Sequence, residues 1–242
     1  MKQKIQEIYE SSHRIYGAPK ITRILWKQGY RITEKTVGNY MRELGIRAKY
    51  VSPYTKTTIS KEGIRDLKNL LKREFNPDKP DAAWCTDITY IYTHGEGFVY
   101  LTSIMDLYSR KIVAWELTRD MKAENVLEAV KKAQYIRNIQ SPLVIHSDRG
   151  IQFTSKEYEE ITVKLECSYS RKGNPWDNAC IESFHAIIKR EWLKEQWFWN
   201  YNQAYWSIYE YIETFYNTIR IHSHCDYESP NDYEKEYYKK QG

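Results

Sequence analysis

The order of hydrophobic patterns in the second half of the chain restricts its fold more than any other feature. Three runs rich in β-branched and aromatic residues, at 84–93, 97–106 and 110–117, are separated only by short polar turns. Such runs predict an antiparallel meander of three strands. After them the patterns predict a helix at 123–137, an apolar strand at 143–145, a helix at 156–165, a short strand at 167–170 and then long helices.

This succession is typical of an α/β fold with a ribonuclease H-like core, in which a mixed five-stranded sheet has flanking helices. A strand that follows a helical crossover lies parallel to its partner, so the fourth strand should return beside the first. The ends of these two strands should therefore meet. Residues placed at those ends are candidates for a shared site.

The first 60 residues carry most of the positive charge, with 12 Lys and Arg against 4 Asp and Glu in a chain of net charge +5. This balance suits a partner with phosphates, although a solvated basic surface would show the same composition. We expect short helices at 3–11 and 19–28. A third should begin after Thr33, a good N-cap, and end near Gly45.

In this third helix the apolar residues recur at helical spacing and should face inward: Val37, Tyr40, Met41 and Leu44. Lys35, Asn39 and Arg42 then occupy the outer face and are candidate DNA contacts. Two short helices with a Gly-containing turn between them form either a helix-turn-helix or a plain helical hairpin.

Changes in composition divide the chain into four parts. A small helical helix-turn-helix domain at 1–60 precedes a linker at 61–80, which contains a short basic helix around 62–73 and a Pro-rich polar stretch at 76–80. The ribonuclease H-like core follows at 81–200. A C-terminal helical extension of the core occupies 201–242.

The four cysteines are far apart, with no C-x-x-C pair, which favours reduced thiols over a zinc site or a disulfide framework. The N-terminal residues lack the apolar stretch of a signal peptide, and no run reaches the length of a membrane span. We therefore expect a cytoplasmic protein, associated with the bacterial nucleoid if it binds DNA.

Three carboxylates are candidates for catalysis. Asp87 lies within the first strand, where a charge is costly unless it is paired or binds a cation. Asp148 follows the fourth strand, next to Gly150, which allows a close approach of the backbone. Each alone could be structural: Asp87 in a salt bridge, Asp148 in a turn or helix cap.

The third carboxylate, Glu182, belongs to a helix with Asn174 as its expected N-cap, and it should lie about two turns from that start. Asn178, Glu182, His185 and Lys189 recur at steps of 4, 3 and 4 and share one face. Such a stripe is often merely solvated. Its amide, imidazole and amine nevertheless suit contact with DNA, so Asn178, His185 and Lys189 are further candidate DNA contacts.

Two strand aspartates and a helix glutamate form a set of hard oxygen ligands, which favours Mg²⁺ or Mn²⁺ over zinc. Two such ions per site can activate a nucleophile and stabilise the leaving oxygen in an in-line displacement at phosphorus. The sequence therefore predicts a two-metal phosphoryl transfer site at Asp87, Asp148 and Glu182.

Several segments resemble, in order, the OrfB-type transposases of bacterial insertion sequences, which have the DDE catalytic core of the retroviral integrase superfamily. The resemblance is carried by residues 13–21, 84–90, 146–155 and 170–184, by Lys189, and by a tail at 216–222 and 229–233. It implies cleavage and strand transfer at the ends of the element during transposition. It also implies terminal-repeat and target DNA as partners, a homo-oligomer in a synaptic complex, and an upstream OrfA-type protein or fusion.

Two features depart from the family pattern. Only 34 positions separate Asp148 from Glu182, which indicates a trimmed segment at 156–168. The chain also begins close to the helix-turn-helix, as the second part of a frameshifted fusion would.

Two other functions remain open at this point. A catalytically silent DNA-binding remnant or regulator would keep the basic helices, and a Holliday-junction or ribonuclease H-like nuclease would keep the core without needing the helix-turn-helix. The aromatic residues at 192–216 are equally open: they could stack on exposed bases or, the interpretation we favour, pack in the core and between subunits.

Overall fold

The computed structural model describes residues 1–49, 67–140 and 142–241. At the N-terminus it contains three helices, α1 (Lys2–Ser11), α2 (Ala18–Lys27) and α3 (Glu34–Glu43). The turn between α2 and α3 passes through Gly29 at a φ of +85°, a conformation that glycine adopts without strain. The Thr33 hydroxyl accepts a hydrogen bond from the Thr36 amide, which confirms the predicted N-cap.

The sheet has five strands in the order β3-β2-β1-β4-β5. Strands β1 (Ala83–Thr93), β2 (Gly97–Asp106) and β3 (Ile112–Thr118) pair as an antiparallel meander. Strand β4 (Val144–Ser147) is parallel to β1, and β5 (Glu166–Tyr169) is parallel to β4. The predicted mixed sheet with a ribonuclease H-like order is therefore confirmed.

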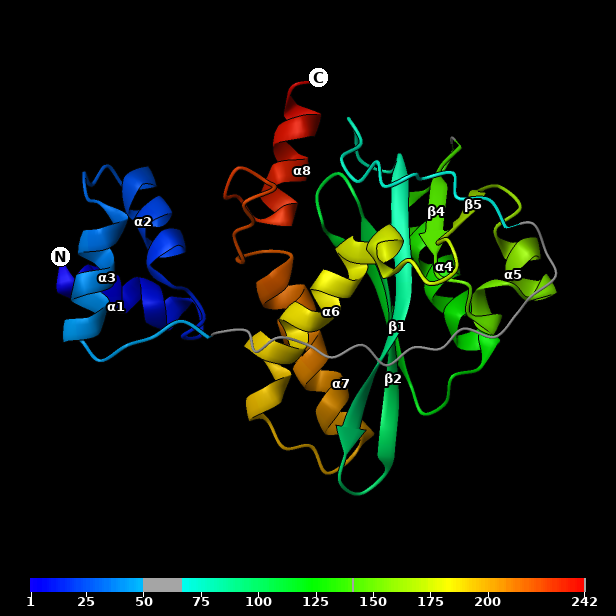
Figure 1. Cartoon of the computed structure of the whole chain (residues 1–242), viewed down its shortest axis with the longest axis horizontal. Helices are drawn as coiled ribbons and strands as arrows, with labels where there is room; N and C mark the ends of the chain where they lie inside the picture. Colours follow the sequence, from blue (N-terminus) through cyan, green and yellow to red (C-terminus); the bar gives the residue numbers. More distant parts are fainter. Residues whose placement is uncertain (50–66, 141, 242) are drawn as a thin grey trace.

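Helices cover both faces of this sheet, as Figure 1 shows. One layer contains α4 (Ala123–Arg137), the short helix η1 (Ile151–Phe153) and α5 (Lys156–Ile161). The opposite layer contains α6 (Ala179–Glu191), α7 (Tyr201–Tyr209) and a π-helical continuation, η4 (Glu210–Tyr216). The tail ends in α8 (Pro230–Lys239), which the Ser229 hydroxyl caps.

Two helices differ from the sequence-based expectation. The helix expected at 156–165 ends at Ile161, because the Thr162 hydroxyl bonds back to the Tyr158 carbonyl and a turn leads into β5. The helix expected from Asn174 begins instead as a short 3₁₀ segment, η2 (Pro175–Asn178). Consequently Glu182 lies in the first turn of α6 and not two turns into a single helix.

The described part of the predicted linker is not helical. Residues 67–70 run beside the outer strand β5, where the Lys68 carbonyl accepts a hydrogen bond from the Tyr169 amide at 2.9 Å. The Ser168 hydroxyl accepts bonds from the amides of Leu70 and Leu71. An edge strand has unpaired backbone groups, and this segment satisfies some of them. The remainder of the expected basic helix, at 62–66, lies outside the described residues.

The N-terminal helices and the α6 layer share one continuous hydrophobic cluster, which includes Ile21 and Leu25 of α2 and Ile188 and Phe215 of the core. The aromatic residues at 192–216 are divided. Tyr211 and Phe215 are fully buried there, whereas Trp197 and Trp206 are exposed. No helix in the described ranges is long and apolar enough to cross a membrane.

Candidate active site

The register of the two central parallel strands brings Asp87 and Asp148 together. Cys85 of β1 pairs with His146 of β4, and this is the last residue pair between the two strands. Asp87 and Asp148 each lie two residues further on, so both belong to the face of their own strand that Cys85 and His146 occupy. Among the described strands none pairs with β1 beyond Cys85 on this side, which leaves its edge open next to the two carboxyl groups.

The surroundings of Asp148 show that this closeness has an electrostatic effect. Burial and the negative charge of Asp87 together raise the pKa of Asp148 to about 6, against the lowering effect of the hydrogen bond from the Gly150 amide. That amide donates to Asp148 Oδ1 at 2.8 Å. A Cβ atom on residue 150 would lie 3.0 Å from the same oxygen, which is closer than most Cβ contacts. Because glycine has no Cβ atom, the Asp148 carboxyl group can occupy this position.

Helix α6 approaches this open edge with two buried polar side chains. Asn178 Nδ2 donates to the Thr86 carbonyl of β1 at 3.1 Å. His185 Nδ1 lies 3.4 Å from Asp87 Oδ2, and its Nε2 lies 3.2 Å from the hydroxyl of Ser103, the β2 partner of Asp87. Both residues are at most 5% exposed, so in this structure their side chains face the sheet and not solvent.

Lys189 and Glu182 lie on the same helix but are more accessible. The Lys189 ammonium group lies 4.5 Å from the centre of the Tyr90 ring, a cation–π contact on β1. Burial lowers the pKa of Lys189, while the negative charge of Asp87 opposes that shift. Glu182 is exposed in the first turn of α6. The predicted polar stripe is therefore half buried against β1.

The donor set fits a hard divalent cation in its chemistry. Two carboxylates repel each other next to a half-buried strand edge, and a cation would relieve that repulsion. The buried Asn178 Oδ1, whose side chain bonds to the Thr86 carbonyl next to Asp87, has no hydrogen-bond partner within the described structure. Among the residues that the structure describes, no three His, Cys, Asp or Glu side chains already converge as metal ligands.

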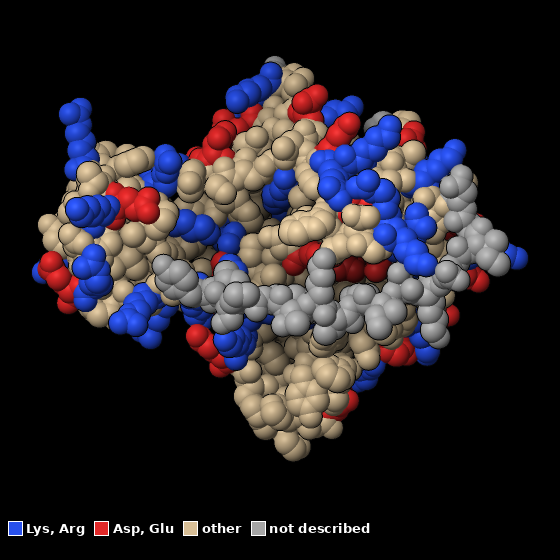
Figure 2. Space-filling view, in the orientation of Figure 1, with Lys and Arg blue, Asp and Glu red and all other residues tan. Residues whose placement is uncertain are grey.

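A second charged cluster surrounds Asp177, between β5 and α6. The fully buried Asp177 carboxylate accepts bonds from Arg171 and Arg73 at 2.6–2.9 Å and from Asn69 at 3.0 Å. The Arg171 guanidinium group holds the pKa of Asp177 well below its usual range. In Figure 2 basic side chains gather on this face beside a recess that contains acidic atoms. Lys72 adds an exposed positive charge to the cluster.

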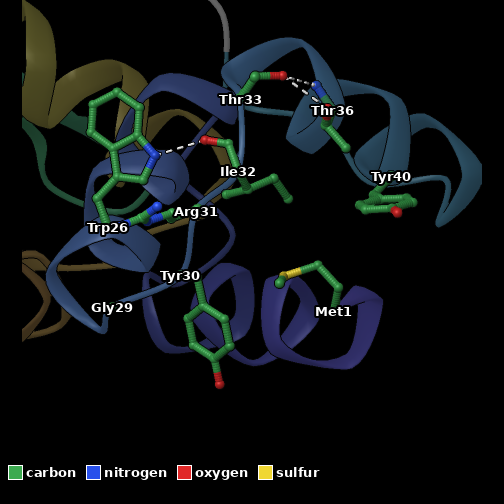
Figure 3. A pocket seen from close by; sticks show the side chains of 9 residues that line it. All are labelled: Met1, Trp26, Gly29, Tyr30, Arg31, Ile32, Thr33, Thr36 and Tyr40. Atoms are coloured by element: carbon green, nitrogen blue, oxygen red, sulfur yellow. Dashed lines mark hydrogen bonds between the residues drawn. The ribbon is translucent and has the colours of Figure 1, made fainter.

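In the N-terminal unit the outer face of α3 has the predicted composition. Lys35 and Arg42 are exposed, and Asn39 is half-buried. Arg42 Nη2 donates to Asn39 Oδ1 at 2.7 Å, which joins the two side chains. A hollow of about 970 Å³ lies between the start of α1, the α2–α3 turn and α3. Figure 3 shows the residues that line it: Met1, Trp26, Gly29, Tyr30, Arg31, Ile32, Thr33, Thr36 and Tyr40.

Comparison with known families covers almost the whole chain. Residues 1–54 match an HTH-like domain, and residues 77–175 and 163–230 match the integrase core domain. The chain is 37% identical over 238 residues to the transposase for insertion sequence element IS904 of Lactococcus lactis, covering 97% of this chain and 93% of that protein. It is 34% identical over 228 residues to transposase InsF for insertion sequence IS3A of Escherichia coli, covering 93% of this chain and 79% of InsF. The chain belongs to the insertion-sequence transposases.

A solved structure with the same fold supports the architecture of this transposase. A chain in the simian T-cell lymphotropic virus intasome, determined in complex with PP2A regulatory subunit B56 gamma, matches with a TM-score of 0.54 and 14% identity. The match covers 95% of the transposase and 74% of that chain. The likeness extends the integrase-type fold to nearly the full length. Of the two N-terminal alternatives, the helix-turn-helix is the one that the family match supports.

Sequence reasoning missed three features of the transposase site. Asp177 lies in the first turn of η2, where an acidic residue is common, and it is also the buried centre of an arginine cluster. Ser103 and Tyr90 contact His185 and Lys189 from the sheet. The Arg-x-x-x-x-x-Asp spacing at 171–177 was a usable signal for the first feature. Contacts from the sheet had no local signal, since they depend on the register of β1 and β2.

Proposed function

We propose that this transposase cleaves and joins DNA strands at the ends of its element, with Asp87, Asp148 and Glu182 as the catalytic residues. The observation that carries the proposal is the position of Asp87 on β1 and of Asp148 just after β4, each two residues past the last pair of these parallel strands, where burial and the charge of Asp87 raise the pKa of Asp148 to about 6. Perturbed carboxyl groups at an open strand edge are typical of functional sites.

The three carboxylates would hold Mg²⁺ or Mn²⁺, two ions per site. When bound, such ions activate an attacking water or 3′-hydroxyl and stabilise the leaving oxygen. Asp87 and Asp148 supply oxygens from the sheet, and Glu182 supplies them from the first turn of α6. The other groups of the proposed site are side chains of the protein.

Three side chains on α6 and at its start have roles that follow from their contacts. His185 lies between Asp87 and Ser103 and orients the Asp87 carboxylate. Asn178 anchors the start of α6 to the Thr86 carbonyl. Both are therefore positioning residues in our proposal, which revises the expectation that they contact DNA. Lys189 remains a candidate phosphate contact, since its amine lies at the open edge of the site.

DNA partners follow from the same arrangement. The outer face of α3, with Lys35, Asn39 and Arg42, would read the terminal repeats, and Arg42 and Asn39 have the side chains best suited to base edges. The basic cluster around Asp177 would contact phosphates near the cleaved bond. Joining two ends requires more than one active site, so we retain the homo-oligomeric synaptic complex. The OrfA-type partner stays a prediction.

The decisive experiment compares the parent with Asp87→Asn, Asp148→Asn and Glu182→Gln in strand cleavage and strand transfer on duplexes carrying the element's own ends. Each change removes a charge with little change in shape, so we expect at least a roughly 10³-fold loss of cleavage with end binding preserved. Mg²⁺ or Mn²⁺ should support the parent, and Ca²⁺ should allow binding with little turnover.

Two results would contradict the proposal. Near-normal cleavage by any of the three variants removes that residue from the catalytic set. Cleavage that persists in excess EDTA excludes the metal-dependent mechanism. A parent chain that binds ends and cleaves nothing under any of these metals would instead be a DNA-binding regulator or remnant.

A further inference from the structure

Two distant segments that stood out in the sequence, 13–21 and 216–222, meet in the structure. Tyr16 lies in the first segment and is 2% exposed. Its hydroxyl accepts a hydrogen bond from the Ile221 amide at 2.9 Å and donates to the Ile219 carbonyl at the longer distance of 3.4 Å. A residue of the helix-turn-helix unit thus has its polar atom between two main-chain groups of the C-terminal tail.

The basic face of α2 also points to the tail. Lys20, Arg23 and Lys27 recur at steps of 3 and 4 and so share one helix face. The Lys20 ammonium group lies 4.6 Å from the centre of the Tyr16 ring, and the Arg23 guanidinium group lies 4.6 Å from that of Tyr227. Lys27 Nζ donates to the Tyr227 carbonyl at 2.8 Å. These cations belong to the basic N-terminal region, but the tail already occupies Arg23 and Lys27, and Lys20 packs on Tyr16.

A third contact joins the N-terminal unit to the C-terminal end of α6. Lys49 Nζ donates to the carbonyl of Glu191, the last residue of α6, at 2.9 Å and pairs with Glu195 at 2.8 Å. The Glu191 carboxylate is itself buried and accepts two bonds of 2.7 Å from Arg220 of the tail. The N-terminal unit therefore rests on α6 and on the tail at once.

The outer face of α3 takes no part in these contacts. Lys35 and Arg42 stay exposed while α2 and residue 49 are engaged. We infer that Tyr16, Lys27 and Lys49 are positioning residues that fix the N-terminal unit on α6 and the tail. This seat, as we call these three contacts, sets the distance along the DNA between the bases that α3 reads and the bond that the core cuts. Only the effect of the seat on the distance along the DNA rests on the proposed function; the contacts themselves do not depend on it.

The seat itself can be tested without DNA, by amide hydrogen exchange of the full chain. In Tyr16→Phe the Ile221 amide loses its acceptor, and its exchange should become roughly tenfold faster. Tyr9→Phe is the matched control, because the Tyr9 hydroxyl donates to the Arg47 carbonyl inside the N-terminal unit at 2.8 Å. If the Ile221 amide exchanges at the same rate in the parent and in both variants, the proposed seat is wrong.

The proposed effect of the seat on spacing is tested by cleavage of duplexes that carry the element end. One to five base pairs are inserted in them between the recognised repeat and the cleavage position. The parent should cut only the native spacing. Tyr16→Phe combined with Lys49→Met should bind the end within about twofold of the parent but cut at scattered positions and accept insertions. Tyr9→Phe combined with Lys4→Met serves as the control and should behave as the parent, because Lys4 pairs with Glu7 inside the N-terminal unit.

The two readouts separate the possible failures. A seat variant that keeps the parent's cutting position and its intolerance of insertions overturns the spacing role. A parent that cuts no duplex, together with faster Ile221 exchange in Tyr16→Phe, contradicts the proposed function and leaves the seat intact.

Discussion

Asp148 combines its proposed catalytic role with a cost to the stability of the fold. Burial and the charge of Asp87 raise its pKa to about 6, so its protonated form is favoured in the folded chain and its ionised form destabilises the fold. The stabilisation from protonation is complete below the ordinary aspartate pKa and is lost as the pH rises through about 6. A cation bound at neutral pH would offset this loss.

The raised pKa of Asp148 leads to a prediction for the stability of the metal-free protein. Asp148→Asn should increase the free energy of unfolding by on the order of 1–3 kcal/mol at about pH 8 and leave it unchanged near about pH 4. Urea unfolding at both pH values checks this, with Asp78→Asn as the control because residue 78 is exposed. The same gain at both pH values would show that charge is not its cause.

Asn178 offers a second test at the scale of single residues. Asn178→Ala leaves the Thr86 carbonyl without its buried donor, which should cost about 1–3 kcal/mol of stability. Cleavage should fall because the start of α6 loses its anchor, while the affinity for DNA stays close to that of the parent. Denaturant unfolding and a gel-shift titration measure the two effects. Weaker DNA binding at unchanged stability would instead restore the sequence-based assignment of Asn178 as a DNA contact.

Among the elements, α3 and α6 should contribute to DNA binding in different ways. Arg42→Ala should reduce the discrimination between element ends and random DNA by about 1–3 kcal/mol, and more than a phosphate contact would, because its partner Asn39 is released as well. Lys189→Ala should lower cleavage and the salt dependence of binding while sequence preference persists.

Competition titrations of both variants at two salt concentrations separate these effects. Lys35→Ala is a suitable companion on α3, since an exposed lysine should change the salt dependence only. If Arg42→Ala distinguishes the two DNAs as well as the parent does, α3 is not the reading helix.

The comparison of elements also shows what a sequence can predict. Strand β2 and helix α4 have the predicted bounds, because alternation and helical spacing are local and strong over ten or more residues. The start of α6 was misplaced because Asn174 and Pro175 suit a 3₁₀ turn as well as an α-helix, and only tertiary contacts decide between them. Residues 67–70 carry helix-compatible side chains, but the open edge of β5 binds them as an extended segment.

At the scale of the whole molecule, the order of elements was enough to predict which strands are neighbours, and hence that Asp87 and Asp148 approach each other. The contacts of the N-terminal unit were beyond such reasoning. Tyr16 and Ile221 are 205 positions apart, and nothing local in either segment indicates the other. The basic charge of residues 1–60 was accordingly assigned to DNA as a whole, although Lys20, Arg23, Lys27 and Lys49 contact α6, the tail or Tyr16 beside it.

The way in which Tyr16 is held has an evolutionary consequence. Within the described part of the chain, its hydroxyl bonds to main-chain atoms of residues 219 and 221 and to no side chain, so the side chains at those positions can change without weakening the bond. Related transposases could then exchange recognition units while keeping one catalytic body, and a lineage could acquire new element ends by recombination between genes. A hydrogen bond to the backbone would in this way leave the modules of the protein interchangeable over evolutionary time.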